Sequence, residues 1–146
     1  ALAALRTRLL PMATVITPNL PEAELLLGRP LRNVVDMHEA LDALHALGAQ
    51  AVLLKGGHLP GDGEVVDLLS DGARVVEFRH ARLSLEAHGT GCTLASAVAA
   101  QLCRGRGLVE ACAAAGDYVH AALLGAYAPG RSEVVVLDHF GAAAHD

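Results

Sequence analysis

The residues best placed to do chemistry form a loop at 88–93, His-Gly-Thr-Gly-Cys-Thr, which precedes a run of small apolar residues. This run predicts a helix over 91–103, so that Gly89 and Gly91 lie at its start. A helix start presents unpaired backbone N–H groups and a partial positive charge, and glycine lets a ligand approach the backbone closely. The loop therefore predicts an anion site, most simply for phosphate, with Cys92 where the helix field favours a thiolate. The alternative is an ordinary tight turn followed by a core cysteine.

Two more polar segments directly follow predicted strands. Asn19 and Glu22 come after a β-branched run at 13–17 and have the spacing of a capping box, an ordinary way to begin a helix. Lys55 ends an apolar run at 51–55 and is followed by two glycines. Ligands of open α/β sheets bind beyond the carboxyl ends of the strands, which makes both segments candidate binding elements. The alternatives are a simple helix cap and a lysine that extends into water.

The elements that must position these segments alternate between helix and strand. Apolar strands that alternate with helices predict an α/β fold whose mostly parallel sheet is covered on both faces. A turn at 70–72 between two short β-branched runs predicts a hairpin within this order. The predicted elements are helix 2–10, strand 13–17, helices 22–27 and 38–47, strand 51–55, hairpin strands 65–69 and 75–78, helices 91–103 and 108–124, and strand 134–137. The end of the chain, 142–146, is expected to fray.

Composition excludes several classes of function. The 146 residues carry a formal net charge of −5 and no basic run, which argues against nucleic-acid binding. The three cysteines have no Cys-x-x-Cys spacing, so a disulfide framework or structural zinc site is not expected and a reducing, cytoplasmic environment fits better. No apolar stretch reaches about 18 residues, so no membrane span is expected. The chain starts as if within a helix and without Met, which predicts that an N-terminal part is absent.

Three stretches together resemble a known family. They are Val-Ile-Thr-Pro-Asn-Leu-Pro-Glu-Ala-Glu-Leu-Leu-Leu-Gly at 15–28, Ala-Val-Leu-Leu-Lys-Gly-Gly-His at 51–58 and His-Gly-Thr-Gly-Cys-Thr-Leu-Ala-Ser-Ala at 88–97. With their spacing, the chain resembles the ribokinase-like kinases, and more narrowly the hydroxymethylpyrimidine/phosphomethylpyrimidine kinases of thiamine biosynthesis. The resemblance extends to about residue 125. It implies that 1–146 is the C-terminal, ATP-binding and catalytic part of one three-layer α/β/α kinase domain.

The resemblance also implies an activity and roles for single residues. The family uses ATP and Mg²⁺ to phosphorylate 4-amino-5-hydroxymethyl-2-methylpyrimidine and then its monophosphate, and its members are usually homodimers. Cys92 matches the position of the catalytic base, and Gly89, Thr90 and Gly91 would form the anion hole around the transferred phosphoryl group. Residues that would bind ATP are Asn19, Glu22, Lys55, Gly57, Thr90 and Gly91, with Glu22 also acting on Mg²⁺, in part through water.

Three other functions remain open from the sequence. A pyridoxal-type kinase shares the fold, and the ring contacts that separate pyridoxal from the pyrimidine lie outside this chain. A non-catalytic module that binds nucleotide or pyrimidine would retain the loops without phosphoryl transfer. Cysteine-nucleophile chemistry, with Cys92 attacking a substrate and His88 assisting, would leave a covalent adduct on the thiol.

Overall fold

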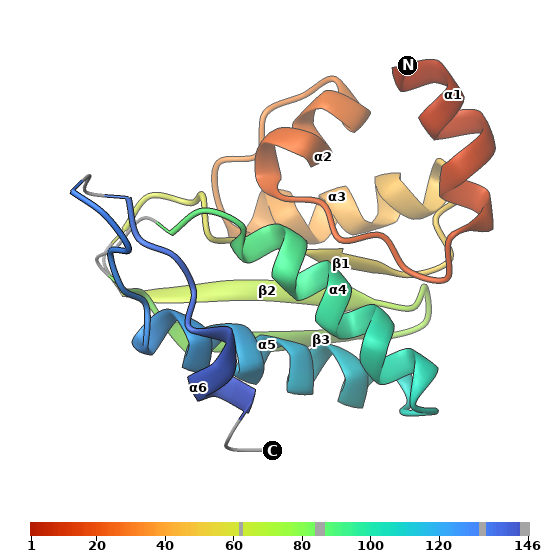
Figure 1. Cartoon of the computed structure of the whole chain (residues 1–146). Coiled ribbons are helices and arrows are strands. Elements are labelled where there is room, and N and C mark those ends of the chain that lie inside the picture. Colours follow the sequence, from red (N-terminus) through yellow and green to blue (C-terminus); the bar gives the residue numbers. More distant parts are fainter. Residues whose placement is uncertain (62, 84–86, 132–133, 144–146) are drawn as a thin grey trace. The chain divides into compact units, whose positions relative to one another are not determined.

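In the computed structural model, the chain divides into two compact units, Ala1–Arg82 and Leu83–Asp146. Figure 1 shows the helices and strands of each. The structure describes residues 1–61, 63–83, 87–131 and 134–143. The predicted fraying at 142–146 is not seen at its first two residues, which lie in a short helix, and 144–146 lie outside the described residues.

The first unit opens with three helical segments of different pitch. They are α1 (Leu2–Ala4), a π-helical segment (Leu5–Leu9) and a 3₁₀ turn (Leu10–Met12). They confirm the helix predicted over 2–10, which continues through Pro11 instead of stopping there. Proline is tolerated in a first turn because its missing N–H has no partner within the helix at that position.

The next two helices, α2 (Leu20–Leu27) and α3 (Val34–Ala46), each begin after an asparagine. Asn33 Oδ1 accepts the Asp36 N–H at 2.9 Å, so α3 begins earlier than the predicted start at 38. Both helices were predicted, over 22–27 and 38–47, and their observed starts are fixed by the asparagine caps. α2 ends, as predicted, at Gly28, whose φ of +71° is left-handed.

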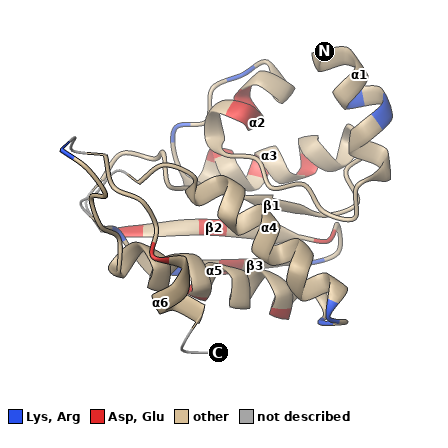
Figure 2. Cartoon of the chain, viewed as in Figure 1, with Lys and Arg blue, Asp and Glu red and all other residues tan. Residues whose placement is uncertain are grey.

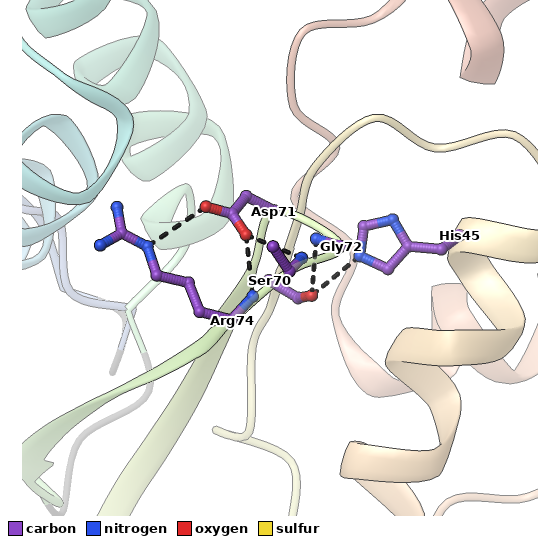
Figure 3. Close-up of polar contacts among 6 residues, drawn as sticks. His45, Ser70, Asp71, Gly72 and Arg74 are labelled. Atoms are coloured by element: carbon purple, nitrogen blue, oxygen red, sulfur yellow. Dashed lines mark hydrogen bonds and ion pairs between the residues drawn. The ribbon is translucent and has the colours of Figure 1, made fainter.

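The strands β1 (Val52–Leu54), β2 (Glu64–Ser70) and β3 (Val75–Ala81) form an antiparallel sheet in the order β1-β2-β3. The predicted hairpin is confirmed as β2 and β3. Its turn is held by Asp71, whose Oδ1 accepts the N–H groups of Ala73 and Arg74 at 3.0 Å each (Figure 3).

The predicted strand 13–17 pairs with β1 in parallel, through separate bridges. Leu53 N–H donates to Ile16 O at 2.8 Å, and Lys55 N–H donates to Pro18 O at 3.0 Å. Pro18 has no N–H with which to complete a continuous parallel ladder between these bonds. The segment 13–17 therefore runs parallel to β1. The strand ladders in the described part of the chain are antiparallel, in contrast to the mostly parallel sheet predicted.

Helix α3 packs against β1 and β2, and α2 packs against α3, with the apolar sides of both helices in one hydrophobic core. Met37 and Leu44 of α3 are fully buried, and they share a hydrophobic core with Val66 and Leu68 of β2. The two-residue period of a strand sends these β2 side chains to one face and Asp67 to the other. Packing of Val66 and Leu68 in the core thus leaves Asp67 on the opposite face of the sheet.

The second unit is helical. Its helices are α4 (Thr90–Cys103), α5 (Leu108–Leu124) and α6 (His139–Ala143). α4 and α5 pack against each other, and Gly105, with φ of +85°, turns the chain between them. The strand predicted at 134–137 is reduced to single bridges of Val135 with Ala87 and Val136 with Tyr127. Every helix in the described ranges is too short or too polar to span a bilayer.

Candidate functional site

Asn19 and Glu22 form the predicted capping box at the start of α2. Asn19 Oδ1 accepts the Glu22 N–H at 2.8 Å, and Glu22 Oε2 accepts the Asn19 N–H at 2.8 Å. These bonds fix the Glu22 carboxylate on an exposed first turn, where it complements the helix dipole. The cap and a role in ligand binding are compatible, because an ionised carboxylate can accept several contacts.

Lys55 lies beside this cap at the end of β1. Its backbone is bridged in parallel with Asn19, and its N–H donates to Pro18 O at 3.0 Å. The first unit therefore brings Asn19, Glu22 and Lys55 together at the carboxyl end of β1. This is the edge of the sheet at which the sequence predicted ligand-binding residues.

The turn that follows Lys55 depends on two glycines in different ways. A Cβ on Gly56 would lie 2.0 Å from Val66 O, so no side chain fits there. A Cβ on Gly57 would meet only Val65 Cγ1, at 4.0 Å. Gly56 is therefore required by packing against β2, whereas Gly57 is exposed and presents its backbone at the surface.

Two side chains that the sequence analysis missed hold this turn. Asp67 Oδ1 accepts the Gly56 N–H at 2.8 Å, and the Arg82 guanidinium donates to Gly57 O at 2.8 Å. Burial raises the pKa of Asp67, against smaller opposing effects of the Gly56 N–H, His80 and Lys55. The available signal was a carboxylate inside the otherwise apolar run 65–69.

The glycine-containing loop of the second unit begins α4 as predicted. Gly89 is the N-cap residue, with a left-handed φ of +88°, and its carbonyl accepts the Thr93 N–H at 2.9 Å. The amides of Thr90, Gly91 and Cys92 precede this first intrahelical donor and point out of the helix end. Gly91 lies within the helix, and its φ is not left-handed. The backbone conformation therefore requires glycine at 89 but not at 91.

The charge around this helix start favours an anion. α4 contains no Lys, Arg, Asp or Glu, and its ribbon is tan throughout in Figure 2. No acidic side chain of its first turn offsets the positive end of the helix dipole. A phosphate group is the kind of ligand that this arrangement accepts.

The three cysteines differ in exposure. Cys92, in the first turn of α4, and Cys103, at its end, are exposed, whereas Cys112 of α5 is buried. Burial raises the pKa of Cys112 to about 11, which makes its thiol inert at neutral pH. Cys92 also lines a cavity of about 590 Å³ within the second unit, together with Ser96 and Arg104. Cys92 is the cysteine that combines exposure with the helix start.

The predicted site residues thus fall into two groups, each assembled within one unit. Asn19, Glu22, Lys55 and Gly57 belong to the first unit, and the loop from Gly89 to Cys92 belongs to the second. Among the described residues, no cluster of three or more His, Cys, Asp or Glu could hold a metal ion. A Mg²⁺ ion would then take most of its ligands from phosphate and water, which is its usual preference.

Comparisons with known proteins point to one family. The family model described as phosphomethylpyrimidine kinase matches residues 1–136. The thiamine biosynthesis bifunctional protein ThiED of Geobacter sulfurreducens is 49% identical over 132 residues, which cover 90% of this chain and 27% of that protein. The hydroxymethylpyrimidine/phosphomethylpyrimidine kinase of Rhizobium meliloti is 47% identical over 125 residues, covering 84% of this chain and 47% of that enzyme.

A solved structure extends the likeness to the fold. The ADP complex of Bacillus subtilis pyridoxal kinase has a TM-score of 0.88 and 39% identity, covering 96% of this chain and 53% of that one. The α/β fold class predicted from the sequence is confirmed by this match. The chain spans about half the length of this structure and of the Rhizobium enzyme, and a smaller share of the bifunctional protein.

Proposed function

Because the chain belongs to the phosphomethylpyrimidine kinase family, we propose that it forms the ATP-binding and catalytic part of a hydroxymethylpyrimidine/phosphomethylpyrimidine kinase. The reaction is the transfer of the γ-phosphoryl group of ATP to 4-amino-5-hydroxymethyl-2-methylpyrimidine, and then to its monophosphate, in thiamine biosynthesis. The observation that carries the proposal is the start of α4 at Gly89-Thr90-Gly91-Cys92, which has no charged side chain in its first turn and no side-chain cap among the described residues, in a chain with these relatives. In this proposal the half of such an enzyme that this chain does not cover supplies most of the pyrimidine contacts, and the full-length enzyme is a homodimer.

The first turn of α4 acts on the transferred phosphoryl group. Its amides at Thr90, Gly91 and Cys92 donate to the equatorial oxygens, on which negative charge is concentrated in the transition state. The helical backbone does not require glycine at position 91. The role of Gly91 in this proposal is to leave space for the phosphoryl group to approach the first-turn amides. The helix field adds to the same stabilisation.

Cys92 serves as the general base. The substrate hydroxyl oxygen forms a bond to the γ-phosphorus while the bond from that phosphorus to the β–γ bridging oxygen breaks, and ADP leaves. The hydroxyl proton passes to the sulfur of Cys92, which is exposed and at the positive end of α4. Cysteine-nucleophile chemistry would instead leave a covalent adduct on Cys92, which mass spectrometry after turnover would reveal.

The ATP phosphates and Mg²⁺ bind to the candidate site residues of the first unit. Lys55 contributes a cation, Gly57 an unobstructed backbone, and Asn19 fixes the Glu22 carboxylate through their paired hydrogen bonds. A single oxygen ligand such as Glu22 fits Mg²⁺, which retains waters and binds mainly through phosphates. When bound, Mg²⁺ neutralises charge on the phosphates.

A pyridoxal kinase is the second candidate, favoured by the similarity to the Bacillus subtilis pyridoxal kinase. ADP release by the full-length protein, measured with hydroxymethylpyrimidine, its monophosphate, pyridoxal and ribose, separates the two. We expect turnover of the two pyrimidines and its loss in Cys92→Ala, with Cys103→Ala, the other exposed cysteine of α4, as the matched control. Preferred turnover of pyridoxal supports the second candidate. Nucleotide binding without any turnover identifies a non-catalytic module and overturns the kinase proposal.

A further inference from the structure

The turn at 55–59 is held mainly by side chains of the hairpin that follows it. Within the turn, Leu59 N–H donates to Gly56 O at 2.9 Å. Asp67 Oδ1, on the neighbouring strand β2, accepts the Gly56 N–H at 2.8 Å. The conformation of Gly56, at the centre of the proposed nucleotide-binding group, is therefore set by a residue eleven positions later in the chain.

Arg82 holds the other end of the turn. Its guanidinium donates to Gly57 O at 2.8 Å and to Leu59 O at 3.0 Å, which uses the planar, forked geometry that only arginine offers. Its Nε is buried and has no hydrogen-bond partner among the described atoms. The backbone of Arg82 is itself fixed, because its N–H donates to Gly63 O at 3.0 Å.

Strand register places Asp67 beside Lys55. β1 and β2 pair Leu53 with Leu69 and Leu54 with Leu68, so the next pair in this register is Lys55 with Asp67. The electrostatic effect of Lys55 on Asp67 is in keeping with this proximity. Because Asp67 points away from the face that carries Val66 and Leu68, it lies on the same side of the sheet as Lys55.

We propose that Asp67 and Arg82 are positioning residues, which hold the turn at 55–59 in the shape that binds nucleotide phosphates. Asp67 acts through the Gly56 amide and counterbalances the charge of Lys55, and Arg82 fixes the carbonyls of Gly57 and Leu59. Neither residue needs to touch ATP. The inference rests on the proposed function of Lys55 and Gly57 as nucleotide-binding residues.

Substitutions at Asp67 separate the hydrogen bond from mere packing. Asp67→Asn retains an oxygen that accepts the Gly56 N–H, whereas Asp67→Leu removes it. We expect Asp67→Leu to raise the Kd for ADP and the KM for ATP about tenfold with kcat nearly unchanged, and Asp67→Asn to recover most of the loss. Glu64→Gln, an exposed carboxylate on the same strand, is the matched control and should bind ADP as the unsubstituted protein does.

Arg82→Lys tests the second contact if Asp67→Leu does not fold. A lysine retains the positive charge but loses the fork, so a similar rise in the Kd for ADP is expected. Folded Asp67→Leu and Arg82→Lys proteins that bind ADP with unchanged affinity would overturn the inference and leave the kinase proposal intact. Absence of ADP binding by the unsubstituted full-length protein would overturn both.

Discussion

Ser70 Oγ lies 2.8 Å from His45 Nε2, in a contact that joins the end of α3 to the hairpin turn (Figure 3). His45 Nδ1 lies 2.8 Å from Ala49 O, which can only accept, so Nδ1 carries the proton and Nε2 accepts from the serine. Ser70 is only 4% exposed, and its Oγ also accepts the Gly72 N–H at 3.2 Å. A serine beside a histidine suggests a nucleophile, but this one is inaccessible and has a structural role.

Ser70→Ala should therefore destabilise the protein without changing its chemistry. Removal of the hydroxyl leaves His45 Nε2 and the Gly72 N–H without their partner, at a cost of roughly 1–3 kcal/mol. Thermal unfolding of the full-length protein measures this loss. Ser96→Ala, an exposed serine of α4, is the control and should shift Tm little. Equal Tm values for both variants would contradict the proposed role of Ser70.

The pH dependence of stability should contain a contribution of unusual sign from Asp67. Because burial raises its pKa above the value of 3.8, the folded state binds this proton more tightly than the unfolded state does. The Asp67 contribution to stability is thus greatest below pH 3.8 and falls as pH rises through the raised pKa. We expect Asp67→Asn to gain stability relative to the unsubstituted protein across this window. Tm measured against pH for both proteins checks the sign.

The two glycines after Lys55 should differ in how strongly an added methyl group destabilises the protein. Gly56→Ala would bring Cβ to 2.0 Å from Val66 O, and the backbone of β1 or β2 must then shift. We expect a loss of about 2 kcal/mol or more for Gly56→Ala and less than about 1 kcal/mol for Gly57→Ala. Denaturant unfolding of the two variants measures the difference. A stable Gly56→Ala protein would show that the close contact with Val66 is wrong.

Gly91→Ala should separate stability from activity. Alanine favours a helical position by about 1 kcal/mol over glycine, so Tm should not fall. The methyl group should nevertheless hinder a phosphoryl group at the first-turn amides and lower kcat by at least about tenfold. Gly89→Ala, at a φ of +88°, should instead lose stability. Unchanged kcat in Gly91→Ala would contradict close approach of the ligand at this residue.

Thiol labelling should distinguish the three cysteines. Cys92 and Cys103 are exposed and should react quickly, whereas Cys112 is buried with a pKa of about 11 and should react after unfolding. ATP together with a substrate analogue should protect Cys92 and leave Cys103 reactive. Mass spectrometry of the labelled peptides identifies each site. Equal protection of both exposed thiols would indicate a general change in the protein instead of a ligand at Cys92.

Local patterns predicted much of this structure. The Asn19–Glu22 cap, the turn at Asp71 and the helix start at Gly89 depend on residues a few positions apart, and each was confirmed. The strand predicted at 13–17 is present only as separate bridges. Its β-branched residues favour a strand, but Pro18 has no N–H to continue the ladder. The start of α3 was placed too late in the sequence. Asn33 lies three residues before Asp36, and this spacing could have indicated the cap that begins the helix.

The contacts of Asp67 and Arg82 could not have been predicted in the same way. Asp67 reaches Gly56 only because β1 and β2 pair in one particular register, and Arg82 reaches Leu59 across 23 positions of the chain. Such contacts depend on how strands align after folding, which composition and periodicity do not specify. The candidate residues themselves, by contrast, lie where strands and helices begin or end, and these positions can be read from sequence.

The start of α4 couples ligand binding to folding. α2 and α3 each begin with an asparagine whose side chain satisfies a first-turn amide, whereas within the described residues no side chain caps α4. A polar cap typically stabilises a helix by about 1 kcal/mol, and α4 lacks this contribution until an anion arrives. Any phosphate-bearing ligand that occupies these amides would therefore raise the free energy of unfolding by mass action. The protein should be most resistant to heat and proteolysis when nucleotide is abundant, so its abundance would follow its ligand supply.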